Sequence, residues 1–313
     1  MSRRLRAVGR RSLGLTGLSV AVVLLAGGTA VARPVAVSDG APVRGAVAAA
    51  PPARPAITKV LTFVVENHSL PQMKASMPFV YGLAKKYAYA DHYNAVAHPS
   101  LPNYLAMVSG GTQGVTDDAP PALHPLGGLT FFDQALSLGK TATLYADSMR
   151  THCQLTSQGR YAVKHNPWAY FTKGRDACGQ HDVPVAQLAA DSDAGTLPNA
   201  GMVVPNLVHD AHDAALGVAD SWIETKVRRV QSGADWKSGH LAIVITADED
   251  DHQGINRVLT VVASRYQVHR VVHADLTHYS LTRLYDSVLG APFLGKAAGA
   301  ASMTGAFSIK TAP

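Results

Sequence analysis

Two runs of six mostly apolar residues, each followed by carboxylates, constrain the fold of this chain more than any other feature. Residues 60–65 run directly into Glu66, and residues 241–246 are followed within two positions by Asp248. A short, continuous apolar run is typical of a strand that is buried on both faces, as in a parallel sheet. We therefore expect two parallel strands that deliver acidic side chains to one edge of a sheet.

Weaker patterns place further elements between and around these two strands. Strands are expected at residues 142–145, 202–204 and 258–262, and helices at residues 78–87, 101–108, 130–138, 219–230 and 280–289. This alternation predicts an α/β layered domain whose ligand site lies beyond the carboxyl ends of the strands. Neither an internal repeat nor a second linker follows Ile57, so residues 57–313 are predicted to form one domain.

The charge of the chain is concentrated in its first segment. The formal net charge is +6, yet eight of the 28 basic residues and only one of the 22 acidic residues precede Ile57. The predicted domain is therefore close to neutral, which disfavours a basic surface that follows nucleic-acid phosphates. With 47% hydrophobic and 16% charged residues, the 313-residue chain is also too apolar to be disordered.

The N-terminal segment has the pattern of a secretory signal peptide. Several arginines precede an apolar stretch at residues 13–26, and the small residues at 30–32 resemble a cleavage site. We expect residues 1–32 to be removed, which leaves a secreted protein without a stable membrane anchor. A retained anchor is the alternative, and the glycines within the apolar stretch argue against it. Arg10-Arg11 leaves twin-arginine export open beside the Sec route.

Residues 33–56 are rich in Ala, Pro and Val and are predicted to be a linker. Export also affects the two cysteines, Cys153 and Cys178, because thiols usually pair outside the cytosol. We expect one disulfide, which would stabilise the fold by about 3 kcal/mol. Two thiolate metal ligands are the alternative, but the CxxC spacing typical of such sites is missing.

Oxygen ligands for a hard cation follow both main strands. Glu66 and Asn67 come directly after the first, and the four carboxylates of residues 248–251 follow the second. Carboxylates packed this closely repel each other unless a cation or solvent compensates their charge, and a divalent metal ion is the natural compensator. A polar turn and an exposed acidic loop are the alternative interpretations.

Ser100 stands immediately before an apolar helical pattern, after Pro99. The position suits a helix N-cap, and it suits a nucleophile equally well, because the free N–H groups and the positive end of the helix dipole favour an alkoxide and bind phosphate oxygens. The two roles are compatible.

Histidines occur at the boundaries of several predicted elements. His165 follows Lys164, His209 and His212 are each followed by an aspartate, and His278 precedes the last predicted helix. Each is by itself more typical of a structural residue than of a catalyst. An adjacent aspartate can, however, orient an imidazole, and Lys164 can hold phosphate oxygens.

Six segments occur together, in the order found in the bacterial phosphoesterase family, and the chain resembles that family over about residues 57–294. They are Glu66-Asn67-His68-Ser69, His98-Pro99-Ser100-Leu101-Pro102-Asn103-Tyr104, Lys164-His165-Asn166-Pro167, Pro205-Asn206-Leu207 with residues 209–213, residues 246–251, and Thr277-His278-Tyr279-Ser280. The family contains secreted acid phosphatases and phospholipases C. The resemblance implies an alkaline-phosphatase-like α/β fold, with a central, mostly parallel sheet flanked by helices on both faces.

The resemblance also implies roles for individual residues. One divalent metal ion, of unknown identity, would be held by Glu66, Asn67, Ser100, Asp248 and Glu249, and Ser100 would also be the nucleophile. The phosphoryl pocket would be lined by His165, His209 and His278, next to the phosphate-holding Lys164 considered above. The residues that support this pocket would be Asp210, His212 and Asp213.

The chain is most similar to the compact actinobacterial acid phosphatases, a branch that includes enzymes acting on phosphatidylinositol 3-phosphate, since phospholipases C more often have Arg in place of His68. We expect a secreted phosphatase that hydrolyses phosphomonoesters, phosphoinositides among them, through a metal-assisted phosphoserine intermediate. His278 or His209 would protonate the leaving alcohol. The substrate would be a phosphorylated small molecule or a lipid headgroup. A phospholipase C-type phosphodiesterase and an inactive secreted binding module remain the alternatives.

Overall fold

The computed structural model describes residues 54–312. The predicted signal peptide and the predicted linker as far as residue 53 lie outside the described residues. None of the helices within residues 54–312 is long and apolar enough to cross a membrane.

An eight-stranded sheet forms the centre of the described structure, with the strand order β5-β4-β6-β1-β7-β8-β2-β9, and β10 and β3 form a small second sheet. The strands are β1 (Lys59–Val65), β2 (Ala88–Ala90), β3 (Tyr93–Asn94), β4 (Ala142–Ala146), β5 (Asp182–Pro184), β6 (Ala200–Val204), β7 (Leu241–Ala247), β8 (Thr260–Ser264), β9 (Arg270–Val272) and β10 (Leu276–Thr277). The five strands from β5 to β7 are mutually parallel, whereas β8 is antiparallel to both β7 and β2. The expected α/β fold with a mostly parallel sheet is confirmed.

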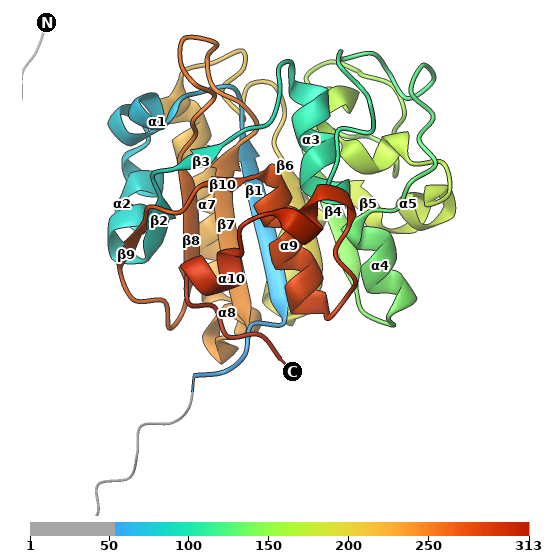
Figure 1. Cartoon of the computed structure of the whole chain (residues 1–313). Coiled ribbons are helices and arrows are strands. Elements are labelled where there is room, and N and C mark those ends of the chain that lie inside the picture. Colours follow the sequence, from blue (N-terminus) through green and yellow to red (C-terminus); the bar gives the residue numbers. More distant parts are fainter. Residues whose placement is uncertain (1–53, 313) are drawn as a thin grey trace, which may run out of the picture. The chain divides into compact units, whose positions relative to one another are not determined.

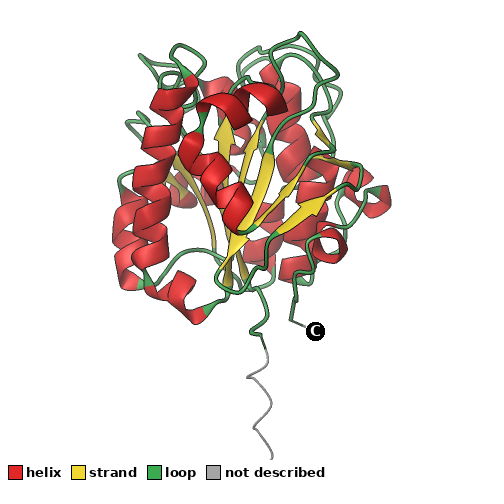
Figure 2. Ribbon diagram, turned by 90° about the vertical axis from the view of Figure 1, so that its left-hand side faces the viewer, coloured by secondary structure: helices red, strands yellow, loops and turns green. Residues whose placement is uncertain are grey.

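Two layers of helices enclose the sheet (Figures 1 and 2). In one layer α9 contacts α3, α4 and α10, and in the other α7 contacts α1, α2, α6 and α8. The α-helices are α1 (Leu70–Ser76), α2 (Pro78–Lys86), α3 (Ser100–Ser109), α4 (Phe131–Ser137), α5 (Arg175–His181), α6 (Gln187–Ala194), α7 (Leu216–Ser232), α8 (Ala234–Ser238), α9 (His278–Leu289) and α10 (Met303–Ala306). Three short 3-10 helices are η1 (Val163–His165), η2 (Pro167–Tyr170) and η3 (Gly295–Gly299).

The two apolar runs form the middle of the sheet. Every residue of β7 is buried, as is every residue of β1 after Lys59. Val65 pairs with Ala247 in register, so the two strands end side by side. This shared register brings Glu66 and Asp248 to the same edge of the sheet.

Helix α9 is fixed to the sheet by one buried aromatic residue. The hydroxyl of Tyr285 donates to the backbone oxygen of Gly201 on β6 at 2.5 Å and lies 2.7 Å from the hydroxyl of Thr62 on β1. Its ring stacks on Phe131 of α4, with 3.8 Å between the ring centroids. The same side chain therefore joins two strands and two helices.

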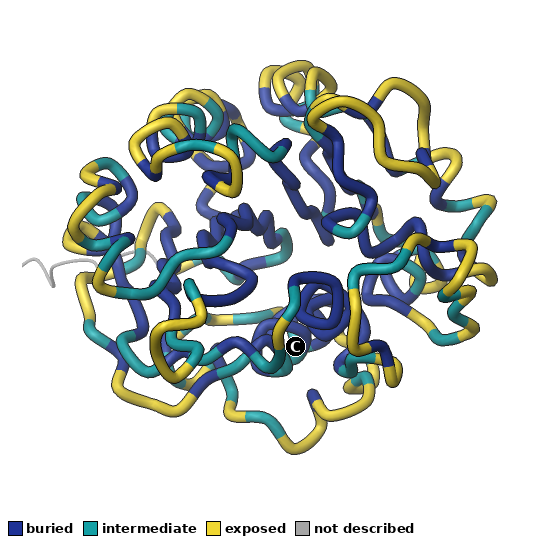
Figure 3. Tube along the Cα trace, turned by 90° about the horizontal axis from the view of Figure 1, so that it is seen from above, coloured by how far each residue is buried: buried dark blue, intermediate teal, exposed yellow. Residues whose placement is uncertain are grey.

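The loops at the carboxyl ends of the parallel strands surround a buried centre. Seen from that end, the residues in the middle of the described domain are mostly buried and those at its rim are mostly exposed (Figure 3). A disulfide joins Cys153, in the loop that follows β4, to Cys178 of α5, which confirms the expected pairing. At the opposite end of the sheet, the backbone N–H of Ile57 donates to the backbone oxygen of Lys310 at 2.7 Å.

Candidate active site

Glu66 lies at the centre of the candidate site. It is 1% exposed, at the end of the central strand β1, and its backbone N–H donates to the backbone oxygen of Asp210 at 2.8 Å. Burial by itself would raise the pKa of the Glu66 carboxyl, but the neighbouring His165 and Lys164 lower that pKa to about 2. Glu66 is therefore a carboxylate at neutral pH.

Ser100 is the first residue of α3, with Pro99 at the N-cap position. The expected N-cap role of Ser100 is therefore not observed. A side chain from another loop instead satisfies the helix start, because Asp118 Oδ1 accepts from the backbone N–H of Leu101 at 2.9 Å. The Ser100 hydroxyl is free to face Glu66: Oγ lies 2.5 Å from Glu66 Oε1 and 3.3 Å from Glu249 Oε1.

Lys164 reaches the same hydroxyl from η1. Its ammonium nitrogen lies 3.3 Å from Ser100 Oγ, 3.5 Å from Glu66 Oε1 and 3.1 Å from Asp118 Oδ2. Burial alone would lower the pKa of Lys164, but the carboxylates of Glu66 and Asp118 raise it above its usual range. A positive charge is thus held against the serine oxygen.

Three carboxylates converge where β1 and β7 end. Glu66, Asp248 and Glu249 are all buried, and each offers an oxygen within 4.8 Å of the others. Burial and the charge of Glu66 raise the pKa of Asp248 well above its usual range and that of Glu249 to about 7. Asp248 Oδ2 is buried and has no hydrogen-bond partner among residues 54–312.

A divalent cation fits this arrangement, because it would compensate the repulsion and use the unpartnered oxygen. Among the other expected ligands, Asn67 directly follows Glu66 and is partly buried, and Ser100 Oγ lies against two of the carboxylates.

His165 lies behind Glu66 rather than at the surface of the site. Its Nε2 forms an ion pair with Glu66 Oε2, its Nδ1 lies 3.3 Å from Asp210 Oδ2, and its ring stacks on Tyr104. Burial would lower the pKa of His165, but Glu66 and Asp210 raise it to about 9. His165 is therefore a buried cation that holds Glu66 in place.

His278, the first residue of α9, is fully buried. Its Nε2 lies 2.6 Å from the backbone oxygen of Asp248 and its Nδ1 lies 3.1 Å from the hydroxyl of Tyr93. Burial lowers the pKa of His278 to about 4. Because both ring nitrogens are engaged, this side chain positions Asp248 and has no nitrogen free to protonate a leaving group.

The structure brings His212, not His209, close to Glu66. His212 Nε2 lies 4.0 Å from Glu66 Oε1, and its Nδ1 lies 2.7 Å from Asp213 Oδ1. His209 instead pairs with Asp147 at 2.5 Å and stacks on Trp222. The expected assignment of His209 to the pocket and of His212 to its support is thus reversed in space.

A cavity of about 590 Å³ opens beside Lys164. Polar side chains, namely Asp118, Lys164 and His212, line one part of it, and apolar ones, including Val163 and Leu207, line another. Lys164 is therefore shared between this cavity and the surroundings of Ser100 Oγ.

Sequence reasoning missed two residues of this region, Asp118 and His98. Asp118 stands in an ordinary loop sequence, and no spacing connects it with Lys164 or with α3. His98 precedes Ser100 within a segment that the resemblance had singled out, and its Nδ1 forms an ion pair with Glu249. The sequence segment from His98 to Tyr104 could therefore have pointed to His98. The contacts of Asp118 are visible only in the folded structure.

The fold is similar to that of solved structures. A solved structure from Vibrio parahaemolyticus, described as a protein in the alkaline phosphatase superfamily, is 12% identical to this chain, with a TM-score of 0.53 over 76% of this chain and 68% of that one. A second solved structure, BT1596, a 2-O GAG sulfatase, is 10% identical, with a TM-score of 0.54 over 82% and 76%. The fold is alkaline-phosphatase-like, as expected.

A model of the Phosphoesterase family matches residues 68–286, and the chain belongs to this family. It is a hydrolase of phosphate esters. A phosphatidylinositol-3-phosphatase of Mycobacterium tuberculosis is 30% identical over 260 residues, which cover 80% of this chain and 83% of the relative. A phosphate-repressible acid phosphatase of Penicillium chrysogenum is 26% identical over 226 residues, or 68% of this chain and 55% of the relative.

Proposed function

We propose that the chain hydrolyses phosphomonoesters with Ser100 as the nucleophile, through a phosphoserine intermediate. The observation that carries this proposal is the environment of one oxygen atom. Ser100 Oγ lies 2.5 Å from Glu66 Oε1 and 3.3 Å from Lys164 Nζ. A hydroxyl with a hydrogen-bond acceptor on one side and a fixed cation on the other is arranged to lose its proton and to attack phosphorus.

Glu66, Asp248, Glu249, Ser100 and Asn67 would hold one divalent cation. When bound, it would lower the pKa of the serine hydroxyl and neutralise charge on the phosphoryl oxygens. The chain's own residues complete the site. His165 orients Glu66, His278 orients Asp248 through its backbone oxygen, and Lys164 faces the position that the phosphoryl group would occupy.

We assign protonation of the leaving alcohol to His212. Its Nδ1 is held by Asp213, so its Nε2 points toward Glu66 and the cavity beside Lys164. His212 is also partly exposed, so it can exchange protons with solvent after each cycle. A positioned general acid contributes on the order of 10² to 10⁴ in rate.

Phosphoinositides are the substrate class that we propose. The cavity combines Lys164 and His212 with apolar residues such as Val163 and Leu207, which suits a phosphorylated headgroup attached to a lipid. The relative from Mycobacterium tuberculosis is itself named a phosphatidylinositol-3-phosphatase. We also propose that residues 1–32 direct export of the chain and are then removed.

The decisive experiment measures phosphate release and phosphoenzyme formation by Ser100→Ala. We expect turnover of p-nitrophenyl phosphate to fall by at least about 10³-fold. We also expect no phosphoryl group from the substrate to remain bound to the protein after acid quench. Ser109→Ala is the matched control, because Ser109 is also buried but lies at the other end of α3. Near-normal turnover by Ser100→Ala would exclude the covalent route. Release of phosphocholine from lecithin, without phosphate release from monoesters, would identify a diesterase instead.

A further inference from the structure

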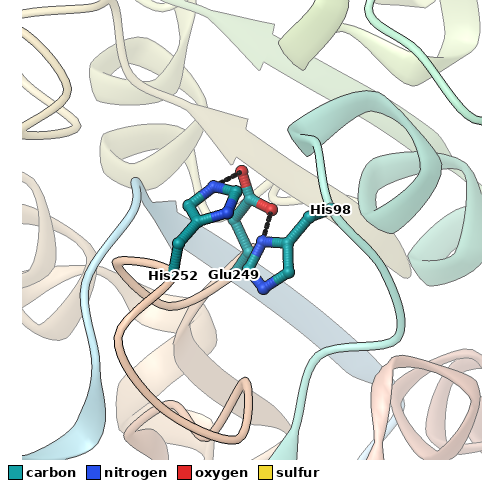
Figure 4. Close-up of side chains that lie close together, drawn as sticks. All are labelled: His98, Glu249 and His252. Carbon is teal, nitrogen blue, oxygen red and sulfur yellow. Dashed lines mark hydrogen bonds and ion pairs between the residues drawn. The ribbon is translucent and has the colours of Figure 1, made fainter.

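A second cluster of possible metal ligands lies beside the nucleophile and shares one residue with the site described above. It consists of His98, Glu249 and His252, each of which offers one ligand atom within 4.8 Å of the others. Glu249 Oε2 pairs with His98 Nδ1, and Glu249 Oε1 lies 3.9 Å from His252 Nε2. Both imidazoles point toward the carboxylate, and their rings are stacked, with 3.9 Å between centroids (Figure 4).

We propose that His98, Glu249 and His252 bind a second divalent cation of the zinc type. Two imidazole nitrogens and one carboxylate oxygen are a common protein donor set for zinc, with the fourth position open to water. The other cluster offers mainly oxygen, which suits a harder cation. The two clusters therefore differ in the chemistry of the ion that each prefers.

The histidines are held in place by a buried residue behind them. Asp250 is 1% exposed, and its Oδ1 lies 3.5 Å from His98 Nε2, so that the other ring nitrogen of His98 faces Glu249. A carboxylate that orients a ligating imidazole in this way is a regular feature of metal sites. The same Oδ1 accepts from the backbone N–H of His252 at 3.0 Å, so one side chain supports both histidines.

Asn256 ties the two parts of the cluster together. Its backbone N–H donates to Asp250 Oδ2 at 2.7 Å, and its side-chain amide donates to the backbone oxygen of Ala97 at 2.8 Å, next to His98. The loop that carries His252 is thus fixed to the segment that carries His98. If His98 and Glu249 formed only an ion pair, neither the imidazole of His252 nor the hydrogen bonds of Asn256 would be needed to maintain it.

Glu249 would then bridge two cations, because its Oε1 also lies 3.3 Å from Ser100 Oγ. An ion at the histidines would hold this carboxylate in a fixed position next to the nucleophile. The inference goes beyond the proposed function, and counting bound metal tests it without any assay of activity.

The experiment counts zinc ions bound by the purified protein after removal of metal with a chelator. We expect His98→Ala/His252→Ala to bind one zinc ion per chain fewer than the wild type, by calorimetric titration and by elemental analysis after gel filtration. Asp248→Asn is expected to keep the ion at the histidines. His124→Ala is the control, because His124 pairs with Asp117 away from the cluster, and it is expected to bind as many ions as the wild type.

Cobalt(II) provides a second readout, because its visible absorption depends on the number and type of its ligands. The cobalt spectrum of the double variant should differ from that of the wild type, whereas His124→Ala should give the wild-type spectrum, and circular dichroism will show whether each variant is folded. If the folded double variant binds as many zinc ions as the wild type, with unchanged affinity and an unchanged cobalt spectrum, the second site does not exist. Failure of the proposed function would appear separately, as turnover by Ser100→Ala with the zinc count unaffected.

Discussion

Asp118 joins the start of α3 to Lys164. One of its carboxylate oxygens accepts from the backbone N–H of Leu101 at 2.9 Å, and the other lies 3.1 Å from the Lys164 ammonium. Leu101 directly follows Ser100. The Asp118 side chain therefore holds Ser100 and the Lys164 ammonium in fixed positions relative to each other.

We therefore expect Asp118→Ala to lower kcat by about 10- to 100-fold, since small displacements of reacting groups have effects of this size. Asp118→Glu should restore part of the loss, and the KM for p-nitrophenyl phosphate should change less than kcat. A loss confined to KM would show that Asp118 acts in substrate binding and not in positioning Lys164.

The general-acid role of His212 leads to a prediction about leaving groups. His212→Gln should lower kcat by about 10²-fold for an alkyl phosphate, and by less for p-nitrophenyl phosphate, whose leaving group needs little protonation. His209→Gln is the matched control, because His209 is also followed by an aspartate but faces Asp147 and Trp222. Equal losses for both substrates in His212→Gln would contradict the assignment.

Removal of metal should abolish most turnover in the wild type. Treatment with a chelator should lower kcat, and addition of a divalent cation should restore it, because Glu66, Asp248 and Glu249 carry charges that need compensation. Asp248→Asn should no longer respond to added cation. Full activity in the presence of chelator, with no metal left by elemental analysis, would argue against a metal-assisted reaction.

The buried Asp182 should make stability depend on pH. Burial raises the pKa of this carboxyl from 3.8 to about 8 in the folded protein. The folded state therefore binds the proton more tightly than the unfolded state does, and the contribution of Asp182 to stability is lost as the pH rises from about 4 to 8. Thermal unfolding between pH 5 and 9 should show a steeper decline in Tm for the wild type than for Asp182→Asn. Parallel curves would show that Asp182 is ionised in the folded protein.

Loss of the disulfide between Cys153 and Cys178 should destabilise the folded protein. Cys153→Ser/Cys178→Ser should lower the free energy of unfolding by about 3 kcal/mol, as expected for a loop of this length. Urea unfolding of the variant and of the wild type, both without reductant, measures the difference. A midpoint equal to that of the wild type would show that the contacts around the disulfide suffice without it.

The main elements were predictable because their signals are local. The runs at residues 60–65 and 241–246 became β1 and β7, and the helical pattern at residues 101–108 became α3. The short strands β2 and β9 were missed, since three residues each carry no periodic pattern and their pairing partners are distant in sequence. The run at residues 258–262 gave a strand, β8, but its antiparallel direction depends on the path of the intervening loop.

The chemistry of the site was predictable only as far as residue types allowed. Glu66, Ser100, Lys164 and Asp248 follow from motifs and meet in space. His209 and His212 have the same neighbour in sequence, so spacing alone could not show which imidazole faces Glu66. The burial of His165 and His278 depends on the packing of Tyr104 and Tyr93, which no local pattern reveals.

The hydrogen bond between Ile57 and Lys310 has a practical consequence. It places both ends of the described domain at the same end of the sheet (Figure 1), whereas α3, which begins at Ser100, starts near the opposite end. A reporter, an affinity handle or a solid support joined close to residue 57 or residue 310 would leave the end of the sheet that carries Ser100 facing outward. The protein is thus suited to immobilisation on a solid support with its substrate supplied in solution.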